Sequence, residues 1–163
     1  MILLSQYDIL TLPSYRAMGM KWTGKYENVK QLKEIIDYME QKGKELKYAI
    51  KPDIQLGLSY HVIPDGFEHY SVFEVSDEQP LLEGLVELHV PELTYLITEH
   101  LKGEDIGKTY DEIASVLKDS EYIPYKAPAI EYFDSLPIKH ERYPVNRDKS
   151  DPQFQILIPI MKK

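Results

Sequence analysis

Residues 54–60, with the sequence IQLGLSY, decide the fold class. Apolar side chains occupy the even positions and small or polar side chains the odd positions, which is the period-2 pattern of a half-buried β-strand. Pro64, Asp65 and Gly66 then predict a tight turn into a second strand over residues 69–75. The stretch therefore predicts an antiparallel hairpin with one covered face.

A strand and a helix precede this hairpin. Residues 7–22 alternate loosely and predict a long strand interrupted near Pro13, because proline cannot donate to a sheet. The next stretch predicts a helix that ends near Gly43. Its apolar residues recur at helical spacing: Val29, Leu32, Ile35, Ile36 and Met39. The first half of the chain is thus predicted as strand, helix, strand, strand.

The second half repeats this order. Residues 85–89 and 93–100 predict one strand broken at Pro91, and a helix follows over residues 106–117. Strands are then predicted at residues 129–134 and 154–160, with the polar residues 135–152 as a long connection. We therefore expect an α+β fold in a single domain, residues 1–163. Two pseudo-symmetric repeats, about 7–76 and 81–162, would form a curved antiparallel sheet with helices on one face.

The predicted strand at 129–134 carries one carboxylate, Glu131, on the same face as Ala129 and Phe133. A charged carboxylate is rarely buried unless something pairs with it. Glu131 is therefore either a structural or solvated residue or the anion at the base of an apolar pocket. The repeat register makes the neutral Gln55 its counterpart. Ile54, Leu56 and Leu58 are expected to face the helices, so that Gln55 lies on the opposite face, where the small residue Gly57 leaves space.

The composition limits the classes of function. The chain has 19 basic and 27 acidic residues, a net charge of -8, and we expect no direct nucleic-acid partner. It has no cysteine and no apolar run of membrane-spanning length, so we expect a cytoplasmic protein without membrane association. Its five histidines lack metal-ligand spacing and it has no phosphate-binding glycine loop, so neither a metal nor a cofactor is predicted.

Four stretches together resemble the GyrI-like fold, which also forms the effector-binding domain of AraC-type and multidrug-responsive bacterial regulators. They are residues 95–100, 110–113, 129–134 and 151–160. The resemblance implies a curved sheet whose concave face holds an aromatic-walled pocket, with a glutamate that maps onto Glu131. Those regulators carry a preceding helix-turn-helix domain, for which we expect no room before the first strand, so a DNA-binding regulator is not predicted.

The predicted site has Glu131 as its anion, with Gln55 as the counterpart of that position. The candidates for its aromatic wall are Trp22, Tyr70, Tyr95 and Phe133, although either Tyr95 or Leu96 could face the pocket. We expect the site to bind a small lipophilic molecule, cationic or electrophilic. Two alternatives stay open. One is a hydrolase that opens strained cyclopropane rings with Glu131 as general acid or base, and the other is a protein-binding regulator of the DNA gyrase type.

Overall fold

The computed structural model describes residues 6–163, which form nine β-strands and two α-helices. The elements of the first half are β1 (Asp8–Leu12), β2 (Tyr15–Lys25), α1 (Lys30–Lys42), β3 (Ile54–Ile63) and β4 (Gly66–Val75). Short 3-10 turns flank α1 on both sides, η1 (Tyr26–Asn28) and η2 (Gly43–Glu45). The second half has β5 (Val86–Val90), β6 (Leu93–His100), α2 (Ile106–Lys118), β7 (Tyr122–Pro124), β8 (Ile138–Pro144) and β9 (Phe154–Lys162).

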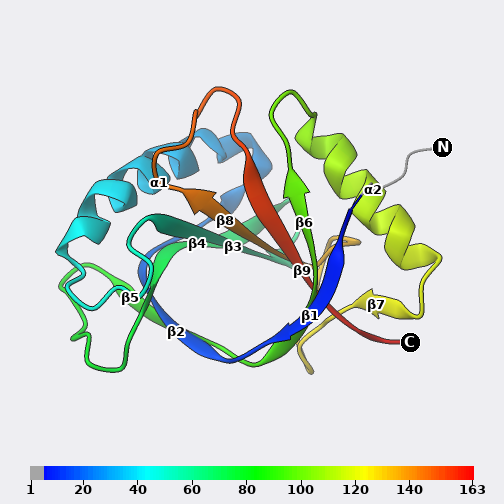
Figure 1. Ribbon diagram of the computed structural model, residues 1–163, viewed down its shortest axis with the longest axis horizontal. Coiled ribbons are helices and arrows are strands. Elements are labelled where there is room, and N and C mark those ends of the chain that lie inside the picture. The colour runs from blue at the N-terminus through cyan, green and yellow to red at the C-terminus, as the bar shows by residue number, and fades with distance from the viewer. Residues whose placement is uncertain (1–5) are drawn as a thin grey trace.

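All the strands join one sheet, in the order β1-β6-β9-β8-β3-β4-β2-β5, with β7 added against β9. Every pairing between these strands is antiparallel. Figure 1 shows a strongly curved sheet with both helices on the same side of it. The α+β class and the curved antiparallel sheet are confirmed, whereas the internal duplication stays a prediction.

Both helices are amphipathic and bury their apolar faces against the sheet. Helix α1 packs Met39 against Met18 and Phe73, while α2 packs Ile113 and Leu117 against apolar residues of β6 and β9. The Asp105 side chain caps α2 by accepting a 3.1 Å hydrogen bond from the Lys108 amide. The two helices cover opposite ends of the sheet, and the strands β3 and β8 meet in its centre.

The other face of the sheet has its own core. Leu56 and Leu58 of β3 pack there with Ala17, Val72 and Val90. This arrangement corrects the predicted orientation of β3. Its even positions, expected to face the helices, lie on the concave side, and Gln55, Gly57 and Ser59 lie on the helix side. Gln55, for example, donates a 3.0 Å hydrogen bond to the Ile36 carbonyl of α1.

The prediction of a strand at residues 129–134 is wrong. These residues belong to the loop between β7 and β8, where Ala129 has a φ of 64°, a left-handed conformation that is incompatible with a strand. The strand that fills this place, β8, lies within residues 135–152, which the polar composition assigned to a connection. Because β8 comes about ten residues later, the register that made Gln55 the counterpart of Glu131 does not hold.

Candidate functional site: a tyrosine-bonded carboxylate between the helices

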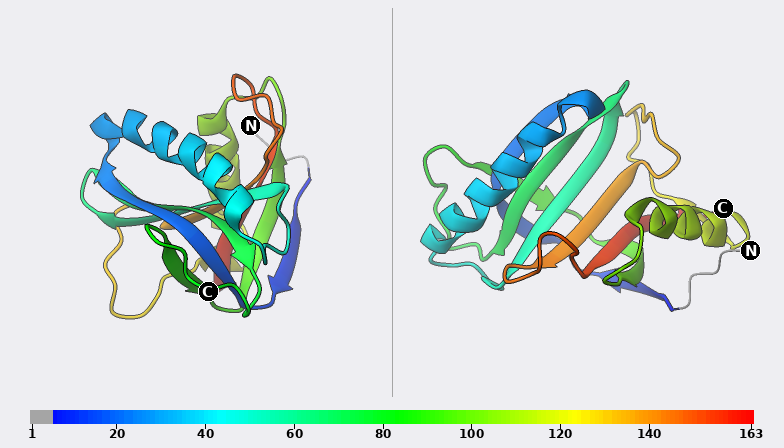
Figure 2. Two further views of the ribbon diagram at one scale, coloured as in Figure 1. Left: turned by 90° about the vertical axis from the view of Figure 1, so that its left-hand side faces the viewer. Right: turned by 90° about the horizontal axis from the view of Figure 1, so that it is seen from above.

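Strand β8 presents a charged and aromatic face toward the helices. Glu141 pairs with Gly57 of β3 and with Ile156 of β9, and Ile156 lies in the core beneath α2. Because side chains alternate along a strand, Lys139, Glu141 and Tyr143 share this face. Seen from above in Figure 2, β8 runs between the two helices and neither helix covers it. The centre of the helix side therefore carries a carboxylate.

Two tyrosines hold this carboxylate. The Tyr110 hydroxyl, from α2, donates to Oε2 of Glu141, and the Tyr143 hydroxyl donates to Oε1. We call these three residues the Glu141 cluster. All three residues are half-buried. The neighbouring Gly57 lets two rings pack against its backbone, because a Cβ atom there would lie only 3.1 Å from the His69 ring and 3.3 Å from the Tyr143 ring.

The protonation of the cluster follows from its burial. Burial raises the pKa of the Glu141 carboxyl above its ordinary value, and the two tyrosine hydrogen bonds oppose this rise. Burial and the adjacent carboxylate also raise the pKa values of Tyr110 and Tyr143, so both hydroxyls remain protonated donors. No Lys, Arg or His within residues 6–163 forms an ion pair with Glu141. Its hydrogen-bond donors are the two neutral hydroxyls, and the charge of Lys139 also lowers its pKa without forming an ion pair.

A second polar group lies beside the cluster on the same face. The Lys139 ammonium donates to Asp134 at 2.7 Å and to Nε2 of His61 at 3.1 Å, and it lies 5.2 Å from the centre of the Tyr110 ring. The Tyr26 hydroxyl hydrogen-bonds the other His61 nitrogen at 2.9 Å. We call Lys139, Asp134 and His61 the Lys139 clamp, because it fastens the loop before β8 to the sheet.

The clamp also sets its own protonation states. Burial and the Lys139 charge lower the pKa of His61 to about 4, so its imidazole is neutral at neutral pH. Burial tends to raise the pKa of Asp134, but the hydrogen bond and charge of Lys139 outweigh it and hold the pKa below the ordinary value. The ammonium is therefore paired with Asp134, and its charge also lowers the pKa of the nearby Glu141 carboxyl.

The sequence-predicted site residues do not come together around one carboxylate. Glu131 and Phe133 are exposed in the loop between β7 and β8. Trp22 is buried beneath α1, where it packs edge-on against Phe67, and Gln55 is a buried partner of α1. These positions give Glu131 no support as a pocket anion, and its role stays a prediction.

Tyr70 and Tyr95 lie on the concave face, away from the helices. Tyr95 is buried in the core, with its ring centre 5.7 Å from that of His140, and the neighbouring Leu96 packs beneath α2. This resolves the uncertain orientation of β6. Tyr70 lines a separate aromatic pocket on the same concave face. Sequence reasoning missed Glu141, although the alternation of residues 138–143 and the spacing of Glu141 and Tyr143 were visible in the sequence.

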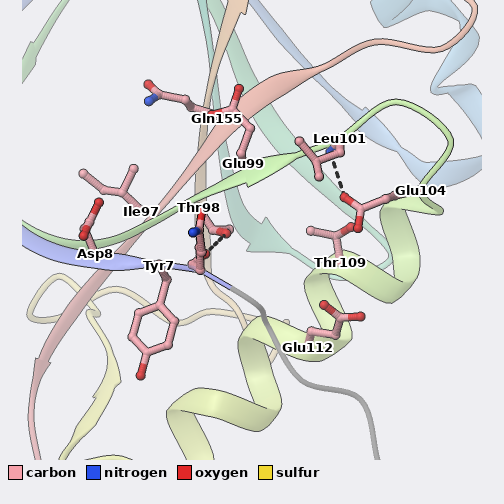
Figure 3. A pocket seen from close by; sticks show the side chains of 11 residues that line it. Tyr7, Asp8, Ile97, Thr98, Glu99, Leu101, Glu104, Thr109, Glu112 and Gln155 are labelled. Atoms are coloured by element: carbon pink, nitrogen blue, oxygen red, sulfur yellow. Dashed lines mark hydrogen bonds between the residues drawn. The ribbon is translucent and has the colours of Figure 1, made fainter.

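A larger cavity of about 890 Å³ lies at the edge of the sheet, between β1, β6 and α2 (Figure 3). Its walls include Asp8, Glu99, Glu104 and Glu112. The Glu104 carboxylate accepts a 2.7 Å hydrogen bond from the Leu101 amide, which closes the turn before α2. Tyr7 is the aromatic residue among its described lining residues, so this acidic, polar cavity offers little of the aromatic surface expected of a site for lipophilic ligands.

A single curved antiparallel sheet with both helices on one face places the chain among the α+β domains. The sequence places the chain within that class more closely. Residues 5–160 match the GyrI-like small molecule binding domain, and the chain belongs to this family. No curated protein matches the sequence at a significant level.

Solved structures agree with the fold. SAV2435 bound to tetraphenylphosphonium superposes with a TM-score of 0.64 at 14% identity, covering 96% of this chain and 94% of SAV2435. The C-terminal domain of EcmrR gives a TM-score of 0.66 at 14% identity, covering 97% and 98%. A hydrolase encoded by lin2189 from Listeria innocua gives 0.57 at 9% identity, covering 96% and 92%. At these identities the similarity establishes the fold alone.

Proposed function

We propose that this protein binds a small lipophilic cation, with Glu141 as the anionic anchor. The observation that carries the proposal is the Glu141 cluster itself, a half-buried carboxylate bonded to two neutral tyrosine hydroxyls and paired with no cation of the described chain. A charge of this kind is costly to keep away from water unless something compensates it. A bound cation would supply the missing compensation.

The surroundings favour a lipophilic cation over a hydrated ion. The Tyr110 and Tyr143 rings lie beside the carboxylate and already attract cationic side chains. Lys139 lies 5.2 Å from the centre of the Tyr110 ring, and Arg147 lies 4.7 Å from that of the Tyr143 ring. A ligand cation that displaced these side chains would gain about 0.5 to 2 kcal/mol for each cation–π contact. The Tyr143 ring packs against the buried Phe154 ring at a centroid distance of 4.5 Å, which holds the Tyr143 ring in place. Apart from its carboxylate the cluster offers few oxygen ligands, and the described residues contain no group of acidic or histidine side chains suited to a metal. An organic cation with apolar substituents therefore fits the chemistry better than a metal ion.

The test is a calorimetric titration with tetraphenylphosphonium. We compare the wild-type protein with Glu141→Gln, which keeps the size of the side chain and removes its charge. Glu131→Gln is the matched control, because it removes one carboxylate from an exposed loop and changes the net charge equally. The proposal predicts that Glu141→Gln weakens binding about 10-fold or more and that Glu131→Gln binds like wild type. Equal affinities in Glu141→Gln and wild type would refute it.

A second function is supported by the protonation of the same carboxyl. Because burial raises the pKa of Glu141 and two hydroxyls contact it, this group suits general acid or base catalysis on a strained electrophile, such as a cyclopropane ring. A tyrosine hydroxyl could stabilise the developing oxyanion. Catalysis predicts multiple turnovers of a cyclopropane-bearing electrophile that Glu141→Gln abolishes, whereas a pure binding protein would give stoichiometric binding without product.

A protein partner and a cellular location are also proposed. A protein partner of the DNA gyrase type rests on the resemblance and on the net charge of -8. A cytoplasmic location rests on the absence of cysteine. In the described part of the chain, neither helix has the length and apolar character to span a bilayer.

A further inference from the structure

The concave face of the sheet carries an aromatic pocket that is separate from the Glu141 cluster. Its volume is about 260 Å³. His140, which lines it, and Glu141 are neighbours on β8 and therefore point to opposite faces of the sheet. The Tyr60 and Tyr70 rings stand at 89° to each other in one wall, with their centres 5.8 Å apart. The pocket and the cluster thus lie on opposite sides of the same strand.

The floor of the pocket is buried and uncharged. His140 is buried, and its Nε2 hydrogen-bonds the Tyr60 hydroxyl at 3.2 Å. Burial lowers the pKa of His140 to about 3, so the imidazole is neutral under ordinary conditions. Tyr95 packs behind it. An entering molecule would therefore meet aromatic rings and a neutral imidazole.

The opposite wall comes from the loop between β7 and β8, which supplies Tyr125, Ile130 and Tyr132. The loop is held at both ends. The Tyr125 amide donates to the Pro159 carbonyl and the Phe133 amide to the His61 carbonyl, both at 2.9 Å. Ile130 nevertheless keeps 49% of its surface exposed. A large apolar side chain at the edge of a preformed apolar pocket offers contact area to a ligand.

The charges around the pocket oppose a cationic ligand. Glu68 is the carboxylate among its described lining residues, and it is already paired with Lys21 at 3.4 Å. The Lys21 ammonium also lies 5.6 Å from the centre of the Tyr70 ring, where a ligand cation would otherwise bind. Unlike the Glu141 cluster, this pocket has no unpaired anion.

We propose that the concave pocket is a second binding site, selective for uncharged aromatic molecules of two or three rings. Tyrosine rings on facing walls provide edge and face contacts for a flat molecule, and the apolar loop side chains exclude water from it. The site is independent of the proposed cation site, because different residues on opposite faces of the sheet form the two.

The experiment is a fluorescence titration with N-phenyl-1-naphthylamine, an uncharged aromatic probe that brightens in apolar surroundings. Ile130→Lys places a charge at the exposed edge of the pocket, and Leu81→Lys is the matched control at an exposed position outside it. We expect binding about 10-fold weaker in Ile130→Lys and unchanged in Leu81→Lys. Tyr132→Ala, which removes a ring from the same wall, should also weaken binding, with folding of each variant checked by thermal unfolding.

The two proposed sites are separated by exchanging probes and variants. Glu141→Gln should bind N-phenyl-1-naphthylamine like wild type, and saturating tetraphenylphosphonium should leave the probe bound. The inference is overturned if wild type fails to bind the probe, if folded Ile130→Lys and Tyr132→Ala bind it like wild type, or if tetraphenylphosphonium displaces it competitively. The effect of Glu141→Gln on tetraphenylphosphonium binding is measured separately, so the failure of one proposal can be distinguished from the failure of the other.

Discussion

Replacing Lys139 by methionine should tighten the binding of a lipophilic cation. In the free protein the Lys139 ammonium lies 5.2 Å from the centre of the Tyr110 ring, close to where a cation held by Glu141 and Tyr110 would bind. At a separation of about 6 Å, two unit charges repel by about 0.7 kcal/mol in bulk water and by about 3 kcal/mol at an effective dielectric constant of about 20. Lys139 therefore competes with the ligand.

The expected size of the effect lies toward the lower of these values, because the Lys139 side chain is 20% exposed and water screens its charge. We expect a gain of about 1 kcal/mol, or about fivefold tighter binding of tetraphenylphosphonium in Lys139→Met, measured by calorimetry at low salt. Lys139→Arg keeps the charge and should bind like wild type. An affinity in Lys139→Met equal to or weaker than that of wild type would refute the reasoning.

Asp134 needs a separate control, since removing Lys139 leaves this carboxylate without its cation, and an unpaired anion would also attract the ligand. The double variant Lys139→Met/Asp134→Asn removes both charges. If the ammonium is the competitor, part of the gain persists in the double variant. A gain that disappears there would assign the effect to Asp134.

Three further predictions follow from single residues. Tyr143→Phe removes a hydrogen bond that lowers the pKa of Glu141, so the pKa should rise in this variant. In titrations at a series of pH values, Tyr143→Phe should therefore lose tetraphenylphosphonium binding at a higher pH than wild type does. His140 has a pKa of about 3 in the fold and an ordinary value of 6.5. The neutral imidazole therefore contributes fully to stability above pH 6.5, and this contribution is lost as the pH falls toward 3. Between about pH 7 and about pH 5, the free energy of unfolding in urea should fall by about 2 kcal/mol more in wild type than in His140→Gln. Gly66→Ala should destabilise the protein by about 2 to 3 kcal/mol in the same assay, because a Cβ atom would lie 2.1 Å from the Gly24 carbonyl oxygen.

Much of the fold was predictable because its pattern is local. Alternation over residues 54–60 and helical spacing around Met39 and Ile113 identify β3, α1 and α2, and Pro13 and Pro91 separate strands where the sheet is interrupted. Each of these patterns involves only residues that are close together in the sequence. The family was identified for the same reason, since its elements follow one another in a fixed order.

The central strand β8 was missed because its helix face is polar and half-buried. Its helix face carries Lys139, Glu141 and Tyr143, whose polar groups are satisfied by tyrosines, Asp134 and His61 from other elements. Such partners come from distant parts of the chain, so the strand looks like a polar connection when the sequence is considered alone. The apolar stretch around Glu131 looked more like a strand, yet its residues serve as the wall of a pocket.

The most direct test of the central claim is a crystal structure of the complex with a bromine-substituted tetraphenylphosphonium, in which anomalous scattering locates the ligand. Our account predicts bromine peaks on the helix side of the sheet, with the phosphonium beside the Glu141 carboxylate and a phenyl ring against Tyr110. Peaks confined to the concave pocket, or to the loop around Glu131, would contradict it.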